Sequence, residues 1–230
     1  EILSTAFPPK VRQEARELTF KFGEQPRKEG YRGYFELDFL IDKKTNEIWL
    51  GELNPRITGC SSMTNHAAFA HADAPLFLFH LLEFSKKKFD LDTTELNNRW
   101  ANPDMIDSWS QMVIKHTDDS VDICTEVPET GIYKMLEDGR VVFDRFDYHR
   151  RAVESENECF FLRILQPGDY RYEGADIGIL VTRGRSMTKS FQLNERAKKW
   201  IHGIKSGVAG VPIPAVQAGP EFGDGAFKIL

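Results

Sequence analysis

The chain has few cysteines and no long apolar run. Its three cysteines, Cys60, Cys124 and Cys159, are widely spaced and form no C-x-x-C pair of the metal-binding type. An odd number of scattered thiols fits a reducing compartment, so we expect a cytoplasmic protein without disulfides. The longest apolar run, near residues 74–82, is far too short to span a bilayer, and no signal peptide is recognisable. We therefore expect no membrane partner.

The sequence also lacks a basic tract and a glycine-rich phosphate loop. Lys and Arg number 30 against 35 Asp and Glu, and the two signs are interspersed, giving a net charge of −5. We therefore expect no nucleic-acid partner. Hydrophobic residues at 41% and charged residues at 28% are typical of a globular protein. The length of 230 residues suits one large domain or two small ones.

The strongest pattern lies in residues 30–65. Two β-rich runs flank a polar link at residues 43–47, which is typical of a hairpin. If the loop holds three or five residues, the numbers of facing pairs sum to about 90. The hairpin pattern therefore predicts that Asp38 lies opposite Glu52.

Alternation along the strands predicts which side chains share the face of this acidic pair. Arg56, an even-numbered residue like Asp38 and Glu52, is expected to point to the same side as this pair. The other side chains that we expect on the face of Asp38 and Glu52 are those of Glu36, Leu40, Asp42, Ile48, Leu50 and Asn54. Apolar neighbours shield the two acids from water, and shielded carboxylates take up a proton or bind a cation. With the neutral oxygen of Asn54, the set suits magnesium, which binds one or two carboxylates plus substrate phosphates. The alternative is a non-catalytic scaffold whose acids are solvated or paired with Lys and Arg.

The same stretch resembles the end of an ATP-grasp catalytic domain. There, an acid on one strand and E-x-N on the next hold magnesium at ATP. Residues 30–33, GYRG, precede an acid before an apolar pair, and ELNPR follows at residues 52–56. This order is similar to that of the carbamoyl-phosphate synthetase and biotin carboxylase branch. The Ser61-Ser62 pair that follows resembles carbamoyl-phosphate synthetases more than biotin carboxylases. The resemblance covers about residues 9–85.

The resemblance implies a site and a reaction. Asp38, Glu52 and Asn54 would be metal ligands, and Arg56 would be catalytic, contacting phosphate or an acyl phosphate. The cofactors would be ATP and Mg²⁺ or Mn²⁺. A ligase of this type activates a small-molecule carboxylate as an acyl phosphate and joins it to an amine. Carboxylation or carbamoyl phosphate formation is the alternative, although residues 58–60 replace the glutamine, valine and glutamate of biotin carboxylases.

The resemblance also implies that half of the active site is missing. ATP-grasp enzymes hold nucleotide between two α+β subdomains, and the first subdomain carries the lid and the phosphate-binding lysines. The chain begins with Glu1 rather than Met, so we expect a piece of a longer protein. The upstream half of that polypeptide would then be a partner, and this chain alone should not turn over. The sequence leaves open whether the protein forms a homodimer.

Three helices are predicted in the first half. Residues 8–23 repeat apolar side chains at helical spacing after two prolines, with Gly23 as the stop. A second helix opens at Ser61-Ser62, and we assign both serines to binding the phosphates or carboxylate of cofactor or substrate, with plain capping an equal alternative. A third, residues 74–84, is so apolar that we expect deep burial. Residues 85–107 contain a lysine cluster followed by Asp and Asn residues, and we interpret them as the transition from this helical part to the β-rich second half.

The second half is predicted to be β-rich. Several runs alternate or are apolar from residue 111 to residue 182, and Asp138-Gly139 marks a hairpin. One amphipathic helix spans residues 193–204 and ends at Gly207. In order of elements this half resembles the β-rich domain that follows the ATP-grasp region in biotin carboxylases. We therefore predict an α+β protein with an ATP-grasp C-terminal subdomain (1–107), a β-rich domain (108–207) and a tail rich in Gly, Pro and Ala (208–230) that is extended or loosely held.

Overall fold

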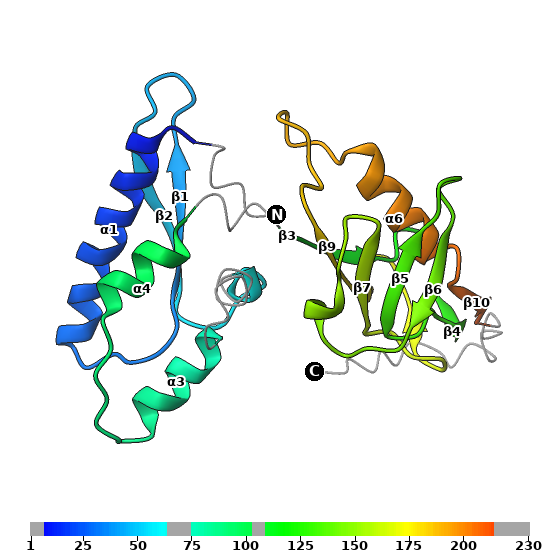
Figure 1. Ribbon diagram of the computed structural model, residues 1–230, viewed down its shortest axis with the longest axis horizontal. Coiled ribbons are helices and arrows are strands. Elements are labelled where there is room, and N and C mark those ends of the chain that lie inside the picture. The colour runs from blue at the N-terminus through cyan, green and yellow to red at the C-terminus, as the bar shows by residue number, and fades with distance from the viewer. Residues whose placement is uncertain (1–6, 64–74, 103–108, 214–230) are drawn as a thin grey trace, which may run out of the picture.

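The computed structural model describes residues 7–63, 75–102 and 109–213. It confirms the α+β class, with antiparallel sheets and several helices. The N-terminal part, on the left of Figure 1, consists of a two-stranded hairpin with helices around it. Its elements are α1 (Pro9–Lys28), β1 (Glu36–Ile41), β2 (Ile48–Asn54), α3 (Leu76–Phe84) and α4 (Thr93–Trp100).

The C-terminal part contains two antiparallel sheets. One has five strands in the order β3-β9-β7-β5-β6, and the other has three in the order β10-β4-β8. The elements are β3 (Trp109–Lys115), β4 (Asp122–Glu126), β5 (Gly131–Met135), β6 (Val141–Arg145), η1 (Arg150–Ala152), β7 (Glu158–Arg163), β8 (Tyr170–Arg171), β9 (Asp176–Arg183), α6 (Glu195–Lys205) and β10 (Ala209–Pro212). The Asp138-Gly139 turn joins β5 and β6, as expected, and Gly139 has a φ of 87°.

The main core lies between α6 and the strands. Asn194 begins α6 by accepting a hydrogen bond from the Ala197 N–H, as a helix N-cap does. Trp200 and Ile204, one helical turn apart, are fully buried and pack with Phe161 of β7 and other strand residues. The amphipathic helix predicted from the sequence is therefore confirmed.

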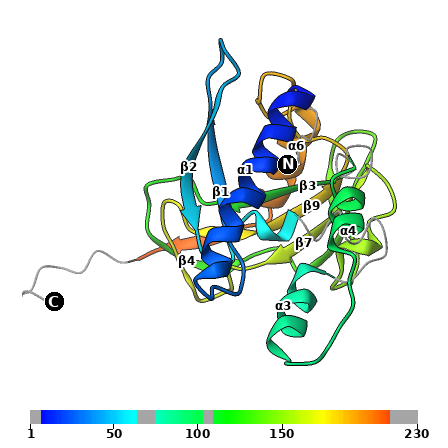
Figure 2. The same ribbon diagram turned by 90° about the vertical axis from the view of Figure 1, so that its left-hand side faces the viewer.

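Helix α1 runs past its predicted end at Gly23 and continues through Pro26 to Lys28. A Cβ on Gly23 would lie 3.2 Å from the ring of Phe35, so this glycine permits a close contact with the chain entering β1. Figure 2 shows α1 beside the hairpin. Because this packing stabilises the helix, it outweighs the weak helix propensity of glycine.

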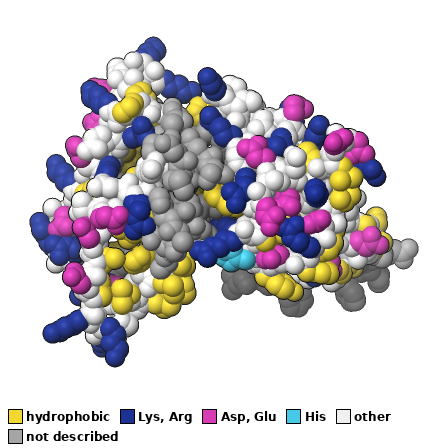
Figure 3. All heavy atoms as spheres, in the orientation of Figure 1, with side chains coloured by type: hydrophobic (Ala, Val, Ile, Leu, Met, Phe, Trp, Pro, Cys, Tyr) yellow, Lys and Arg dark blue, Asp and Glu magenta, His cyan; other side chains and the backbone are white. Residues whose placement is uncertain are grey.

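In the following segment one expectation is wrong and one helix was not predicted. Helix α3 is not deeply buried, and Figure 3 shows hydrophobic side chains at the surface in this region. Its exposed apolar residues are Phe77, Leu78, Leu81 and Phe84. Residues 85–107 contain helix α4, whose N-cap Asp92 accepts a hydrogen bond from the Glu95 N–H. Trp100 of α4 is buried against α3. No neighbour in the described chain covers the outer side of α3, which the sequence of the helix alone does not reveal.

The first described residues of the predicted tail are extended. Residues 209–212 form β10 and pair with β4, so of the two predicted states they adopt the extended one. The rest of the tail, residues 214–230, lies outside the described residues, as do residues 64–74 of the second and third predicted helices. Within the described ranges, no helix combines the length and apolar character needed to cross a bilayer.

Candidate functional site

The hairpin has the predicted register at its acidic end. Asp38 lies opposite Glu52, and a bulge follows directly, because Phe39 pairs with Leu50 and leaves Gly51 as the extra residue. The hairpin loop closes through a hydrogen bond of 2.9 Å from the Asp42 N–H to the Glu47 carbonyl oxygen. Loop length and side-chain alternation therefore predicted the position of the acidic pair.

The bulge corrects the predicted faces. Ile48 lies opposite Ile41 and Leu50 opposite Phe39, so Ile48 and Leu50 belong to the apolar face and not to the acidic face. That apolar face meets α1, where Leu18 and Phe22 line a small hollow with Phe39 and Leu50. The acidic face instead carries Leu40 and Trp49, whose side chains are 65% and 51% exposed.

The two acids are open to solvent, which contradicts the expected shielding. Asp38 and Glu52 are both exposed, and neither side chain has a hydrogen-bond or ion-pair partner within the described residues. Directly opposed side chains on a hairpin have Cβ atoms about 5 Å apart, and like charges at that distance repel. A cation between the two carboxylates would relieve this repulsion.

A third acid on the same face was not among the predicted site residues. Glu36 lies opposite Asn54, and its carboxylate accepts a hydrogen bond from the Thr58 hydroxyl. The parity of Glu36 with Asp38 was visible in the sequence, whereas the contact with Thr58 depends on the turn after β2. Across residues 7–63, 75–102 and 109–213, no three His, Cys, Asp or Glu side chains converge closely enough to hold a metal by themselves.

Asn54 and Arg56 are brought together at the end of β2. The Asn54 side chain is buried, and its Oδ1 accepts a hydrogen bond of 3.0 Å from the Arg56 guanidinium. An amide oxygen has two lone pairs, so Oδ1 can accept this bond and still face a second donor or ion. The remaining guanidinium N–H groups of Arg56 leave donors for an anion.

The two predicted serines follow in a tight turn. The described chain becomes helical at Ser61, but Ser61 Oγ accepts from the Thr58 N–H at 3.0 Å, so it braces the turn. Ser62 Oγ lies 3.2 Å from the Gly59 carbonyl oxygen and 2.9 Å from Gln111 Oε1. Both hydroxyls therefore have local partners, which favours structural bracing over the predicted anion contact.

A hollow of about 360 Å³ opens beside the acidic face. Its lining includes Glu36, Asp38, Cys60 and Ser61. Burial raises the pKa of the Cys60 thiol, and the charges of Glu36 and Asp38 raise it further, so the thiol stays protonated at neutral pH. Glu52, Asn54 and Arg56 are not among its lining residues: Glu52 and Asn54 lie on β2, and Arg56 follows the end of that strand.

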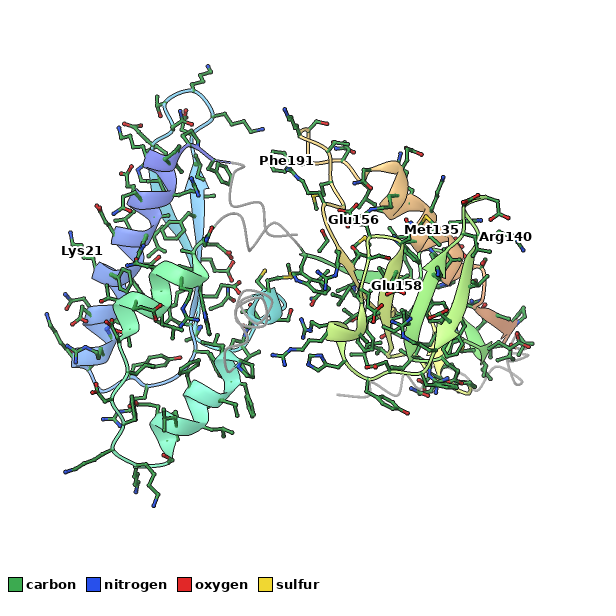
Figure 4. The ribbon with its side chains drawn as sticks, viewed as in Figure 1. Lys21, Met135, Arg140, Glu156, Glu158 and Phe191 are labelled. Carbon is green, nitrogen blue, oxygen red and sulfur yellow. The ribbon has the colours of Figure 1, made fainter. Side chains whose placement is uncertain are left out.

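Buried charges in the C-terminal part are paired. Glu158 of β7, labelled in Figure 4, accepts hydrogen bonds from the Arg145 guanidinium and the Glu154 N–H. Burial raises the pKa of Glu158, but these hydrogen bonds outweigh it and the net pKa is lowered. The unpaired carboxylates of the hairpin differ from this pattern.

Comparison of the chain with protein-family models, curated proteins and solved structures finds no match.

Proposed function

We propose that this chain carries the metal-binding part of an ATP-dependent carboxylate–amine ligase of the ATP-grasp type. The carrying observation is that Asp38 and Glu52 lie directly opposite each other without a cationic partner in the described chain. Asn54 ends β2 on the same face, and Arg56, two residues further on, donates a hydrogen bond to Asn54 Oδ1. ATP with Mg²⁺ or Mn²⁺ would be the cofactors, and a small-molecule carboxylate and an amine the substrates.

The donor set fits a hard divalent cation. Two carboxylates and one amide oxygen suit Mg²⁺, which takes only one or two protein carboxylates and completes its shell with water and nucleotide phosphates. Such a site needs no third acidic ligand. The proposal therefore agrees with the finding that no three His, Cys, Asp or Glu side chains of the described residues converge on one point. When bound, the ion neutralises charge on the phosphoryl oxygens of the nucleotide.

The residues of the chain have separate roles in this proposal. Asp38 and Glu52 hold the ion, and Asn54 adds a neutral oxygen and orients Arg56 through their hydrogen bond of 3.0 Å. The fork of Arg56 donates to oxygens of the transferring phosphoryl group or of the acyl phosphate, where negative charge develops. Glu36 holds Thr58, and thereby the turn that leads to Ser61.

The test is Mn²⁺ binding to the 230-residue chain, measured by electron paramagnetic resonance with and without a non-hydrolysable ATP analogue. We expect the analogue to strengthen Mn²⁺ binding, because its phosphates complete the coordination shell. Asp38→Ala and Glu52→Ala should each weaken binding by about tenfold or more, since even the loss of an outer partner of a metal ligand costs this much.

Glu47→Gln is the matched control, because it removes a carboxylate from the same hairpin but from its loop. Its Mn²⁺ affinity should equal that of the wild type. Negligible binding by the wild type, or equal binding by all four proteins, would favour a non-catalytic scaffold and end the ligase proposal.

A further inference from the structure

A second hollow lies on the other side of α1 from the hairpin. It has a volume of about 620 Å³ and is lined by the first three turns of α1 together with Asn97 and Ala101 at the end of α4. Figure 1 shows α4 crossing beside α1. Because α1 turns Leu18 and Phe22 toward the apolar face of the hairpin, this hollow is separated from the acidic face by a helix and a sheet.

The described residues that line the hollow include two arginines and no acid. The Arg16 guanidinium donates to Asn98 Oδ1 at 2.6 Å and lies 5.7 Å from the centroid of the Phe20 ring. The Arg16 guanidinium is therefore held in place, and its other N–H groups can donate hydrogen bonds to a ligand. The floor combines this fixed cation with the aromatic ring and with Pro9 and Ala101.

Arg12 is the unusual member of this lining. Its Nε atom is shielded from solvent, yet the Arg12 side chain has no hydrogen-bond or ion-pair partner among the described residues. Buried donors are nearly always paired, so an orphaned one calls for an explanation, and an absent ligand is one. The cavity in front of the side chain supplies the room for that ligand.

The position of Arg12 along the helix points to the same conclusion. It lies near the N-terminus of the 20-residue helix α1, whose first turn contains no acid. The N-terminal end of a helix carries partial positive charge, so cations there are disfavoured and anions are stabilised. Two arginines line the hollow without an acid among its described lining residues, and Arg12 lies near this end, so a negatively charged occupant is favoured.

We propose that the hollow between α1 and α4 binds a small organic anion. Its phosphate or carboxylate group pairs with Arg12 and Arg16, whose planar forks match such groups. An apolar, planar part of the molecule packs against Phe20 and Pro9. This site is additional to the proposed nucleotide site and does not depend on it, since no residue is shared.

The experiment is isothermal titration of the 230-residue chain with phenyl phosphate, benzoate and inorganic phosphate. We expect phenyl phosphate or benzoate to bind, and whichever binds to outperform inorganic phosphate because of its ring. Arg12→Gln should weaken binding by about tenfold or more, the loss that follows when one charged hydrogen-bonding partner is removed. Lys28→Gln is the control, because it removes the same charge from the exposed last turn of the same helix.

A second variant guards against loss of folding in Arg12→Gln. Gln13→Glu places a negative charge on the wall of the hollow at a solvent-exposed helix position, and it should abolish anion binding. It replaces the exposed Gln13–Glu17 hydrogen bond by a like-charge pair, which affects helix stability only slightly, so the thermal midpoint should change little. Wild-type protein that binds neither organic anion would overturn the proposal. So would unchanged affinity in both Arg12→Gln and Gln13→Glu, and equal affinity for inorganic phosphate and the aromatic anions would overturn its organic part.

Discussion

Asp122 on β4 shows how this protein holds the charges that it buries. The Asp122 and Arg171 side chains are only 8% and 13% exposed, and Arg171 of β8 donates a hydrogen bond to the Asp122 carboxylate. This bond lowers the pKa of Asp122, burial opposes it, and a further hydrogen bond from Ser120 also lowers the pKa. Asp122 is therefore ionised at neutral pH in the folded protein.

The lowered pKa makes a prediction about acid stability. Because the folded-state pKa of Asp122 lies below the unfolded value of about 3.9, its stabilising contribution is complete above about pH 5, decreases as the pH falls past the unfolded value and is lost below the folded-state pKa. Asp122→Asn removes this dependence. From pH 7 to pH 3, the wild-type free energy of unfolding should therefore fall more than that of the variant, as measured by urea denaturation.

The exposed Asp119→Asn substitution is the control, and it should follow the wild-type curve. Parallel loss of stability in the wild type and Asp122→Asn would contradict the assignment of the pH dependence to this pair.

Asp38, Glu52 and Arg12 form the contrasting group of charges. None of their side chains has a hydrogen-bond or ion-pair partner in the described part of the chain, although Asp38 and Glu52 lie opposite each other and Arg12 lines the same hollow as Arg16. Surface charges without partners are common, but like charges held opposite each other cost stability. These residues therefore carry both binding proposals.

Helix α6 depends on a glycine for its contact with β6. A Cβ on Gly203 would lie 2.4 Å from the Cβ of Val141. Gly203→Ala gains about 1 kcal/mol of helix propensity, but overpacking against a β-branched side chain costs roughly 1–3 kcal/mol. We expect net destabilisation of up to about 2 kcal/mol, measured by chemical denaturation.

The double variant Gly203→Ala/Val141→Gly tests the cause. It should be more stable than the sum of the two single effects, because removing the whole valine side chain, including its Cβ, relieves the clash. A Gly203→Ala protein as stable as the wild type would contradict this prediction, because it would show that Val141 moves away from the added methyl group at little cost.

The hairpin shows which features of an element its sequence determines. Alternating side chains and a polar loop were enough to place Asp38 opposite Glu52. The bulge at Gly51 was not predicted, although a glycine inside a strand pattern often indicates one, and it reversed the faces of Ile48 and Leu50. Likewise α4 was missed despite the N-cap Asp92 and Glu95 three residues later, a recognisable helix start.

Features that depend on contacts between elements were the hardest to predict. The extension of α1 past Gly23 depends on Phe35, and the exposure of Phe77 on α3 depends on what lies beside the helix. In the candidate site, Asp38, Glu52 and Asn54 follow from strand parity and the motif. The bracing of Ser61 by Thr58 requires the folded turn, and so does the orphaned Nε of Arg12.

At the scale of the whole molecule, the strand pairings divide between two parts. Among the described residues, each sheet is formed within residues 36–54 or within residues 109–212. The approach of Ser62 Oγ to Gln111 Oε1 is a contact between the two parts. The predicted boundary at residue 107 stays a prediction, and every residue of the two proposed binding sites belongs to the N-terminal part.

The central claim is that the acidic face of the hairpin binds a divalent cation together with nucleotide phosphates. The most direct measurement is paramagnetic broadening of backbone amide NMR signals by Mn²⁺ in the presence of a non-hydrolysable ATP analogue. We predict selective broadening at residues 36–38 and 52–56, and its loss in Asp38→Ala. Uniform broadening, or broadening centred on another group of acids, would contradict the account.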